Sequence, residues 1–153
     1  MQQAYPSGVD CAWLASDRNG HLGTFITAGS APIPIEALNA DFAVVDLEDA
    51  LCKLPPVSGV QLLVSVPRPD SYRKLAERGF YVYDWMDVHQ PAKDATGAYQ
   101  PVAIPIDPIG FDTLPTELAA LARAIDFGAV IFEDHHNLDV RLHMACVTPE
   151  RFF

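Results

Sequence analysis

Prolines divide this chain into short segments and limit the length of the strands and helices it can form. In GSAPIP (29–34), Pro32 and Pro34 lack backbone N–H donors and bias the residues before them toward extended backbone, so we expect no regular element there. The proline pair at 55–56 ends the helix predicted before it, and Pro105 predicts a strand that lies at a sheet edge or ends early. The elements between these prolines follow from the spacing of apolar residues.

Short apolar and β-branched runs predict the strands. CAWLAS and HLGTFITA, joined by DRNG, predict an N-terminal β-hairpin because Asn and Gly tolerate positive φ in tight turns. Further apolar runs predict strands at 42–45, 60–66, 80–84, 101–106 and 129–132. The run at 60–66 (VQLLVSV) is apolar enough to predict a buried, central strand.

The C-terminal region has a period of two. Leu138, Val140, Leu142 and Met144 alternate with Asp139, Arg141, His143 and Ala145, which predicts a half-buried strand. Because another strand is predicted at 129–132, residues 133–137 become the turn of a second hairpin.

Three segments have apolar residues at helical spacing: 46–54, 70–78 and a segment that opens at Thr113 or Leu114 and ends at Gly128. Asp70 is a suitable N-cap for the second helix, with Gly79 just past its end. We therefore predict one α+β domain over residues 1–153. It has a mixed, mostly antiparallel sheet, about three helices packed mainly on one face, and β-hairpins at both ends.

The charged residues are unevenly distributed along the chain. The net charge is −10, from 20 acidic and 10 basic residues, and residues 107–139 contain seven acidic residues and one basic residue, Arg123. Nucleic-acid binding is disfavoured, because it depends on Lys and Arg replacing the counterions of phosphate. An acidic face favours a basic protein partner, although acidity that serves only solubility is the alternative.

The sequence carries few other functional signals. No apolar run has the roughly 18–20 residues of a membrane helix, and MQQAYPSGVD does not resemble a secretory signal, so we expect a cytoplasmic protein that does not contact membranes. Three cysteines, far apart and without a CxxC pair, predict buried free thiols. Common nucleophile, zinc-protease, phosphate-loop and dinucleotide motifs are missing, and no cofactor is expected.

One cluster of residues supports an enzymatic alternative. In YDWMDVH (83–89), Asp84, Asp87 and His89 directly follow a predicted strand. Two carboxylates and an imidazole could hold a divalent ion or share general acid–base catalysis. The simpler interpretation is that both aspartates are turn residues, while Trp85 and Met86 close the edge of the core.

The stretch FEDHHNLDVRLH (132–143) suggests a metal site, with His135 and His136 as its candidate ligands. Adjacent histidines point apart in extended backbone, and Asp and Asn are ordinary turn residues, so turn chemistry explains the cluster better than a metal does. One of the two imidazoles could still reach the loop that carries Asp84, Asp87 and His89.

The stretches VDCAWLASDRNGHLGTFITAGSAPIP (9–34) and RPDSYRKLAERGFYVYDW (68–85) resemble small uncharacterised proteobacterial proteins. In size, acidity and α+β composition the chain also resembles immunity proteins, which neutralise toxins. This resemblance implies a non-enzymatic cytoplasmic protein that occludes a basic toxin.

Our leading hypothesis is therefore a binding protein whose acidic face covers a basic partner. The candidate partner-binding residues are Asp112, Glu117, Asp126, Glu133 and Asp134, with Trp85 as an aromatic anchor. A metal-dependent hydrolase that uses the Asp/His cluster is the first alternative. A structural homodimer formed through a sheet edge, at the C-terminal strand or the Pro105 strand, is the second.

Overall fold

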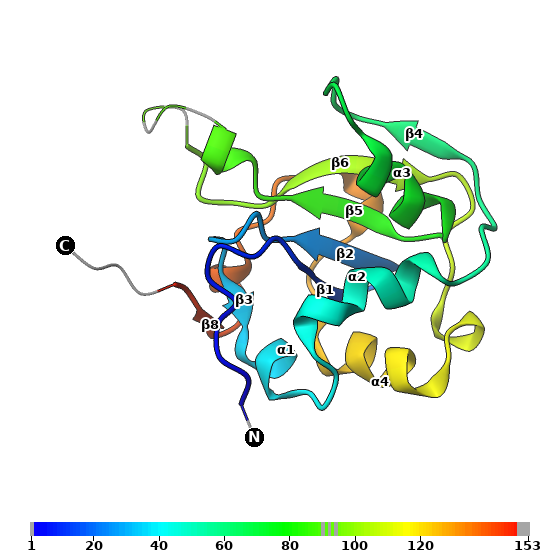
Figure 1. Cartoon of the computed structure of the whole chain (residues 1–153). Helices are drawn as coiled ribbons and strands as arrows, with labels where there is room; N and C mark the ends of the chain where they lie inside the picture. The colour runs from blue at the N-terminus through cyan, green and yellow to red at the C-terminus, as the bar shows by residue number, and fades with distance from the viewer. Residues whose placement is uncertain (1, 90, 92, 94, 150–153) are drawn as a thin grey trace.

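A mixed six-stranded sheet lies at the centre of the protein, in the order β4-β6-β5-β2-β1-β7 (Figure 1). The structure is a computed structural model that describes residues 2–89, 91, 93 and 95–149, without the side chain of His89. The six strands are β1 (Ala12–Asp17), β2 (Leu22–Ile26), β4 (Val60–Leu62), β5 (Tyr81–Asp84), β6 (Gln100–Pro105) and β7 (Asp126–Phe127). A second, two-stranded sheet pairs β3 (Ile33–Pro34) with β8 (Cys146–Val147).

The predicted α+β class is confirmed. The helices are α1 (Ile35–Asn39), α2 (Val44–Cys52), α3 (Asp70–Glu77) and α4 (Thr116–Ala124). Within the described residues, β1 pairs antiparallel with β2, and β6 pairs antiparallel with both β4 and β5. The β1–β7 and β2–β5 pairings are parallel.

Strands β1 and β2 are buried along their whole length because both faces of the sheet are covered. Side chains alternate between the two faces: Ala12 and Leu14 join one core cluster, and Trp13 and Ala15 join the other. The first cluster also contains the buried residues of α3 and α4 and most of those of α2, so these three helices pack mainly on one face, as predicted.

The opposite face is aromatic. The Trp13 ring stacks on Phe25 at 4.2 Å between centroids, and Phe25 stacks on Tyr83 at 4.7 Å. The Trp13 Nε1–H donates to the Tyr99 hydroxyl at 3.0 Å, and that hydroxyl donates to the Pro32 carbonyl at 2.7 Å. The cover of this face comes from α1, β3 and the C-terminal segment rather than from long helices.

The prediction of a second hairpin, in the C-terminal region, is wrong. Residues 129–147 form the 3₁₀ turns η4 (Phe132–Asp134) and η5 (Val140–Leu142) followed by β8, and Leu138 forms an isolated bridge with Tyr99. The Asp139 side chain caps η5 by accepting from the Arg141 N–H at 3.1 Å. Leu138 and Val140 are buried while Leu142 is 81% exposed, so the apolar alternation does not correspond to one strand face.

Two further strand predictions need correction, and the prediction for Pro105 holds in one of its two alternatives. Residues 42–45 contain the start of α2, because Val44 is buried on the same helix side as Leu47 and Leu51. The segment predicted as a central strand is the short β4 at a sheet edge, where only β6 pairs with it. Strand β6 does end at Pro105, but it lies inside the sheet between β4 and β5 rather than at an edge.

Among the described residues, no helix combines the length and the apolar character needed to cross a bilayer.

Candidate partner-binding groove

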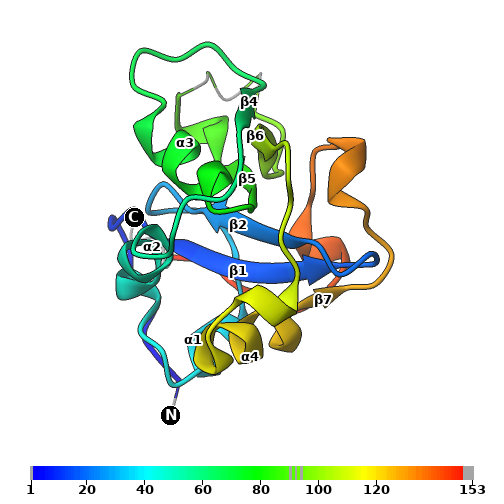
Figure 2. The same cartoon turned by 90° about the vertical axis from the view of Figure 1, so that its right-hand side faces the viewer.

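A surface groove opens between α1, the α1–α2 connection and α4, which lie side by side (Figures 1 and 2). Its volume is about 490 Å³, within the usual size range of ligand pockets. Nine residues line it: Glu36, Asn39, Ala40, Asp41, Phe42, Glu117, Ala120, Leu121 and Ala124.

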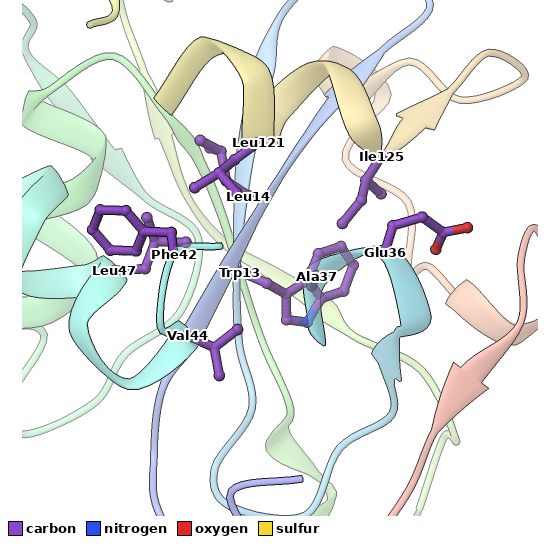
Figure 3. A pocket seen from close by; sticks show the side chains of 9 residues that line it. All are labelled: Trp13, Leu14, Glu36, Ala37, Phe42, Val44, Leu47, Leu121 and Ile125. Atoms are coloured by element: carbon purple, nitrogen blue, oxygen red, sulfur yellow. The ribbon is translucent and has the colours of Figure 1, made fainter. Parts of the chain in front are cut away.

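A narrow apolar slot leads from the groove toward the sheet. Its lining includes Trp13, Leu14 and Ile125, and it shares Glu36, Phe42 and Leu121 with the groove (Figure 3). The slot has a volume of about 10 Å³, roughly one water molecule, so the side chains nearly fill it. In Figure 3 the carboxylate of Glu36 points away from the apolar side chains. The groove therefore has an apolar floor with a charged group at its edge.

Helical periodicity places the groove residues of α4. Leu118, Ala119 and Ala122 are buried against the sheet, which turns Glu117, Ala120 and Ala124 outward. Two alanines on the exposed side leave helix backbone within reach of a docked segment. On α1, the same helical periodicity leaves Ala37 and Leu38 buried and Glu36 and Asn39 exposed.

The rim of the groove is acidic. Glu36, Asp41 and Glu117 are all exposed, and no Lys or Arg that the structure describes lines either the groove or the slot. Across the described part of the chain, the ion pairs are Arg78–Glu77 at 3.4 Å and Arg141–Asp139 at 3.0 Å. The three rim carboxylates thus form no ion pair within the described chain.

The predicted acidic face is spread over several sites. Glu117 lines the groove, Asp112 is exposed in η3 (Phe111–Thr113), and Asp126 lines a different hollow beside Arg18 and Arg123. Glu133 and Asp134 are exposed in η4, where Asp134 lines a third hollow. The predicted anchor Trp85 is half-buried, with its ring 5.3 Å from Tyr99.

The candidate catalytic aspartates support separate pieces of local structure. Asp84, buried at the end of β5, accepts hydrogen bonds from the Tyr72 hydroxyl and from the Trp85 N–H. Burial, reinforced by the bond to Asp84, raises the pKa of Tyr72.

Asp87 lies in η1 (Met86–His89) and folds a loop. It accepts from the backbone N–H groups of Thr96 and Gly97, both at 2.8 Å. The side chain of His89 lies outside the described residues, so the three-residue cluster is described only at Asp84 and Asp87.

The candidate metal ligands His135 and His136 are exposed. His135 has the left-handed backbone conformation, with φ of 56°, at the end of η4. His136 lines the third hollow together with Asp134 and His143. Within the described residues, no group of three or more His, Cys, Asp or Glu side chains is arranged to hold a metal ion.

Sequence reasoning missed Glu36, Asp41 and Phe42. The prediction of a strand at 42–45 concealed the short turn between α1 and α2, and this turn brings these side chains to the groove. The signal that could have found the turn is the i, i+3, i+7 spacing of Val44, Leu47 and Leu51, which extends the helix back to Val44.

Comparison with protein-family models, with curated proteins and with solved structures finds no match for this chain.

Proposed function

We propose that this protein is a non-enzymatic, cytoplasmic binding protein that covers a basic surface on a protein partner. The observation that supports the proposal is the groove between α1 and α4, where three carboxylates that form no ion pair with any described residue surround an apolar floor. The occupant that fits is a basic segment with an apolar side chain flanked by Lys or Arg.

The two parts of the groove have different roles in this proposal. The rim carboxylates attract a cationic segment from a distance and fix its register, which mainly increases the association rate. Contact of the apolar side chain with Phe42, Leu121 and the two alanines removes apolar surface from water and supplies most of the affinity.

Occlusion is then the mechanism. A bound segment would be covered by this protein and could not reach its own target, which is how an immunity protein neutralises a toxin. No chemical step on the partner is required.

The test uses two variants with the same change in net charge. The groove variant is Glu36→Gln/Asp41→Asn/Glu117→Gln, and the matched control is Asp107→Asn/Asp112→Asn/Asp126→Asn, three exposed positions outside the groove. A partner captured from the native cell is purified, and its dissociation constant is measured by calorimetry with each variant at low and high salt.

We expect the groove variant to weaken binding about tenfold, since three solvent-exposed ion pairs are each worth a few tenths of a kcal/mol or more. The control should weaken binding much less, and the wild-type affinity should fall with salt. Binding that is indifferent to salt, or equal losses in the two variants, would contradict the proposal.

A further inference from the structure

The third hollow, which His136 and Asp134 line beside η4, has the character of a small-molecule site. Its volume is about 270 Å³, and residues 129–131 form part of its wall. Tyr83 from β5 and the side chains of Asp134, His136, Asn137 and His143 supply its polar lining.

Tyr83 is the unusual member of this lining. It is 2% exposed, and its ring is held between Phe25 and Phe132, at centroid distances of 4.7 and 5.6 Å. No residue in the described part of the chain forms a hydrogen bond with its hydroxyl, whereas the hydroxyl of the equally buried Tyr99 both accepts and donates one. Because Tyr83 lines the hollow and its hydroxyl is not sealed away in the core, a ligand in the hollow can form a hydrogen bond with that hydroxyl in place of water.

Burial raises the pKa of Tyr83, and the carboxylates of Asp17 and Asp134 act in the same direction. The phenol is therefore protonated at neutral pH and its oxygen can still accept a hydrogen bond. The carboxylate of Asp134 also places a negative charge near the phenol.

The other polar groups are acceptors of the same kind. Asp134 is a carboxylate, Asn137 has an amide oxygen beside its N–H donors, and the imidazoles of His136 and His143 can each offer an acceptor nitrogen as well as a donor. None of the described Lys or Arg residues lines the hollow, so an anion would meet the charge of Asp134 without a compensating cation from this part of the chain. Val130, Ile131 and Leu138 provide an apolar wall beside the polar groups.

We propose that this hollow binds an alkylguanidinium group. A guanidinium has five N–H donors in one plane, enough to bond Asp134 through two of them and still reach the phenol and a neighbouring acceptor. An alkyl stem would lie along Val130, Ile131 and Leu138. The proposal does not depend on the groove between α1 and α4.

The experiment is an NMR titration of the whole chain with methylguanidinium, followed through the imidazole signals of His136 and His143. We expect saturable shifts that are absent with acetate and weaker with methylammonium.

Asp134→Asn should weaken binding about tenfold, because it removes a charge-assisted pair of hydrogen bonds. Tyr83→Phe should weaken binding several-fold while leaving the aromatic packing in place.

Asp112→Asn, the same change at an exposed site in η3, is the matched control and should bind as wild type does. A parallel titration with acetyl-arginine amide distinguishes the two sources of the group. Tighter binding than methylguanidinium indicates an arginine side chain, and weaker binding indicates a free small cation.

Shifts that never saturate, equal binding of acetate, or equal affinities of Asp134→Asn and Asp112→Asn would overturn the proposal. The groove is tested by other substitutions, so failure of one site is distinguishable from failure of the other.

Discussion

The carboxylate of Asp17 accepts a hydrogen bond from the backbone N–H of Phe132 at 2.8 Å. Its other oxygen accepts from the N–H groups of Asn19 and His21, both at 2.9 Å. One buried side chain at the end of β1 therefore closes the β1–β2 turn and also fastens the C-terminal segment to the sheet.

Asp17→Ala should destabilise the protein strongly. The substitution removes three hydrogen bonds to a carboxylate and leaves the buried N–H of Phe132 without its acceptor, so we expect the free energy of unfolding to fall by about 3 kcal/mol. Urea denaturation measures this change in the free energy of unfolding. Asp126→Ala, at an exposed position in β7, is the control and should change stability by less than about 0.5 kcal/mol. Equal effects of the two substitutions would contradict the assigned role of Asp17.

Tyr99→Phe should lower the free energy of unfolding much more than Tyr83→Phe does. Loss of the Tyr99 hydroxyl leaves the buried Trp13 Nε1–H and the Pro32 carbonyl without their partner, a cost of about 2 kcal/mol. The Tyr83 hydroxyl has no partner among the described residues, so its removal should cost less than about 0.5 kcal/mol. Denaturation followed by tryptophan fluorescence compares the two variants, and similar losses would show that the hydrogen bonds of Tyr99 add little.

Local signals in the sequence predicted much of the helical face. Asp70 is the first residue of α3 rather than its N-cap, which is Pro69, whereas Gly79, with φ of 93°, follows the end of the helix as predicted. The stripe through Leu114, Leu118 and Ile125 is buried as expected. These features depend on residues close in the chain, which is why periodicity and capping revealed them.

The C-terminal segment could not be predicted in the same way. Its apolar alternation fits a strand, but the conformation depends on Asp17, more than a hundred residues earlier, and on the bridge between Tyr99 and Leu138. The groove has the same origin: Glu117 was identified from charge, but Glu36 and Asp41 reach its rim only through the packing of α1 beside α4.

Gly23→Ala should weaken the contact between β2 and η4. A Cβ at this position would lie 2.9 Å from the ring of Phe132, closer than packed atoms tolerate, so the ring must move. We expect a loss of about 1–3 kcal/mol in thermal or urea unfolding. Gly128→Ala is the control, because a Cβ there meets no atom within 4 Å. A Gly23→Ala protein as stable as the Gly128→Ala protein would indicate that η4 is loosely attached.

Stability should fall steeply in alkaline solution. The pKa of all five tyrosines is raised, chiefly by burial, so the folded protein keeps phenol protons that the unfolded chain loses above about pH 10. The unfolded state then binds fewer protons, and each such tyrosine lowers the free energy of unfolding by about 1.4 kcal/mol per pH unit above that point.

The tyrosinate absorbance should therefore stay low and then rise in one cooperative step together with loss of circular dichroism. A gradual rise beginning near pH 10 in the folded protein would contradict this expectation.

The thiols should react slowly at neutral pH. Burial raises the pKa of Cys11, Cys52 and Cys146, and that of Cys146 reaches about 11, with Glu36 contributing. Because the thiolate is the reactive form, alkylation by iodoacetamide should be much slower in the folded protein than in urea. Mass spectrometry of the alkylated chain measures the rates, and equal rates in the two states would contradict the prediction.

The aromatic face of the sheet has a consequence for synthesis of the chain. Its cover is tied down by contacts of long sequence separation, among them Arg18 with Val130 and Tyr99 with Leu138. A ribosome that has released residues up to Asp107 has supplied β1–β6, while Phe127, Phe132 and Leu138 are still missing from the Trp13 cluster. The nascent chain thus exposes its aromatic surface until the segment that contains Phe127, Phe132 and Leu138 has been made, so its risk of aggregation depends on how fast residues 108–138 are translated.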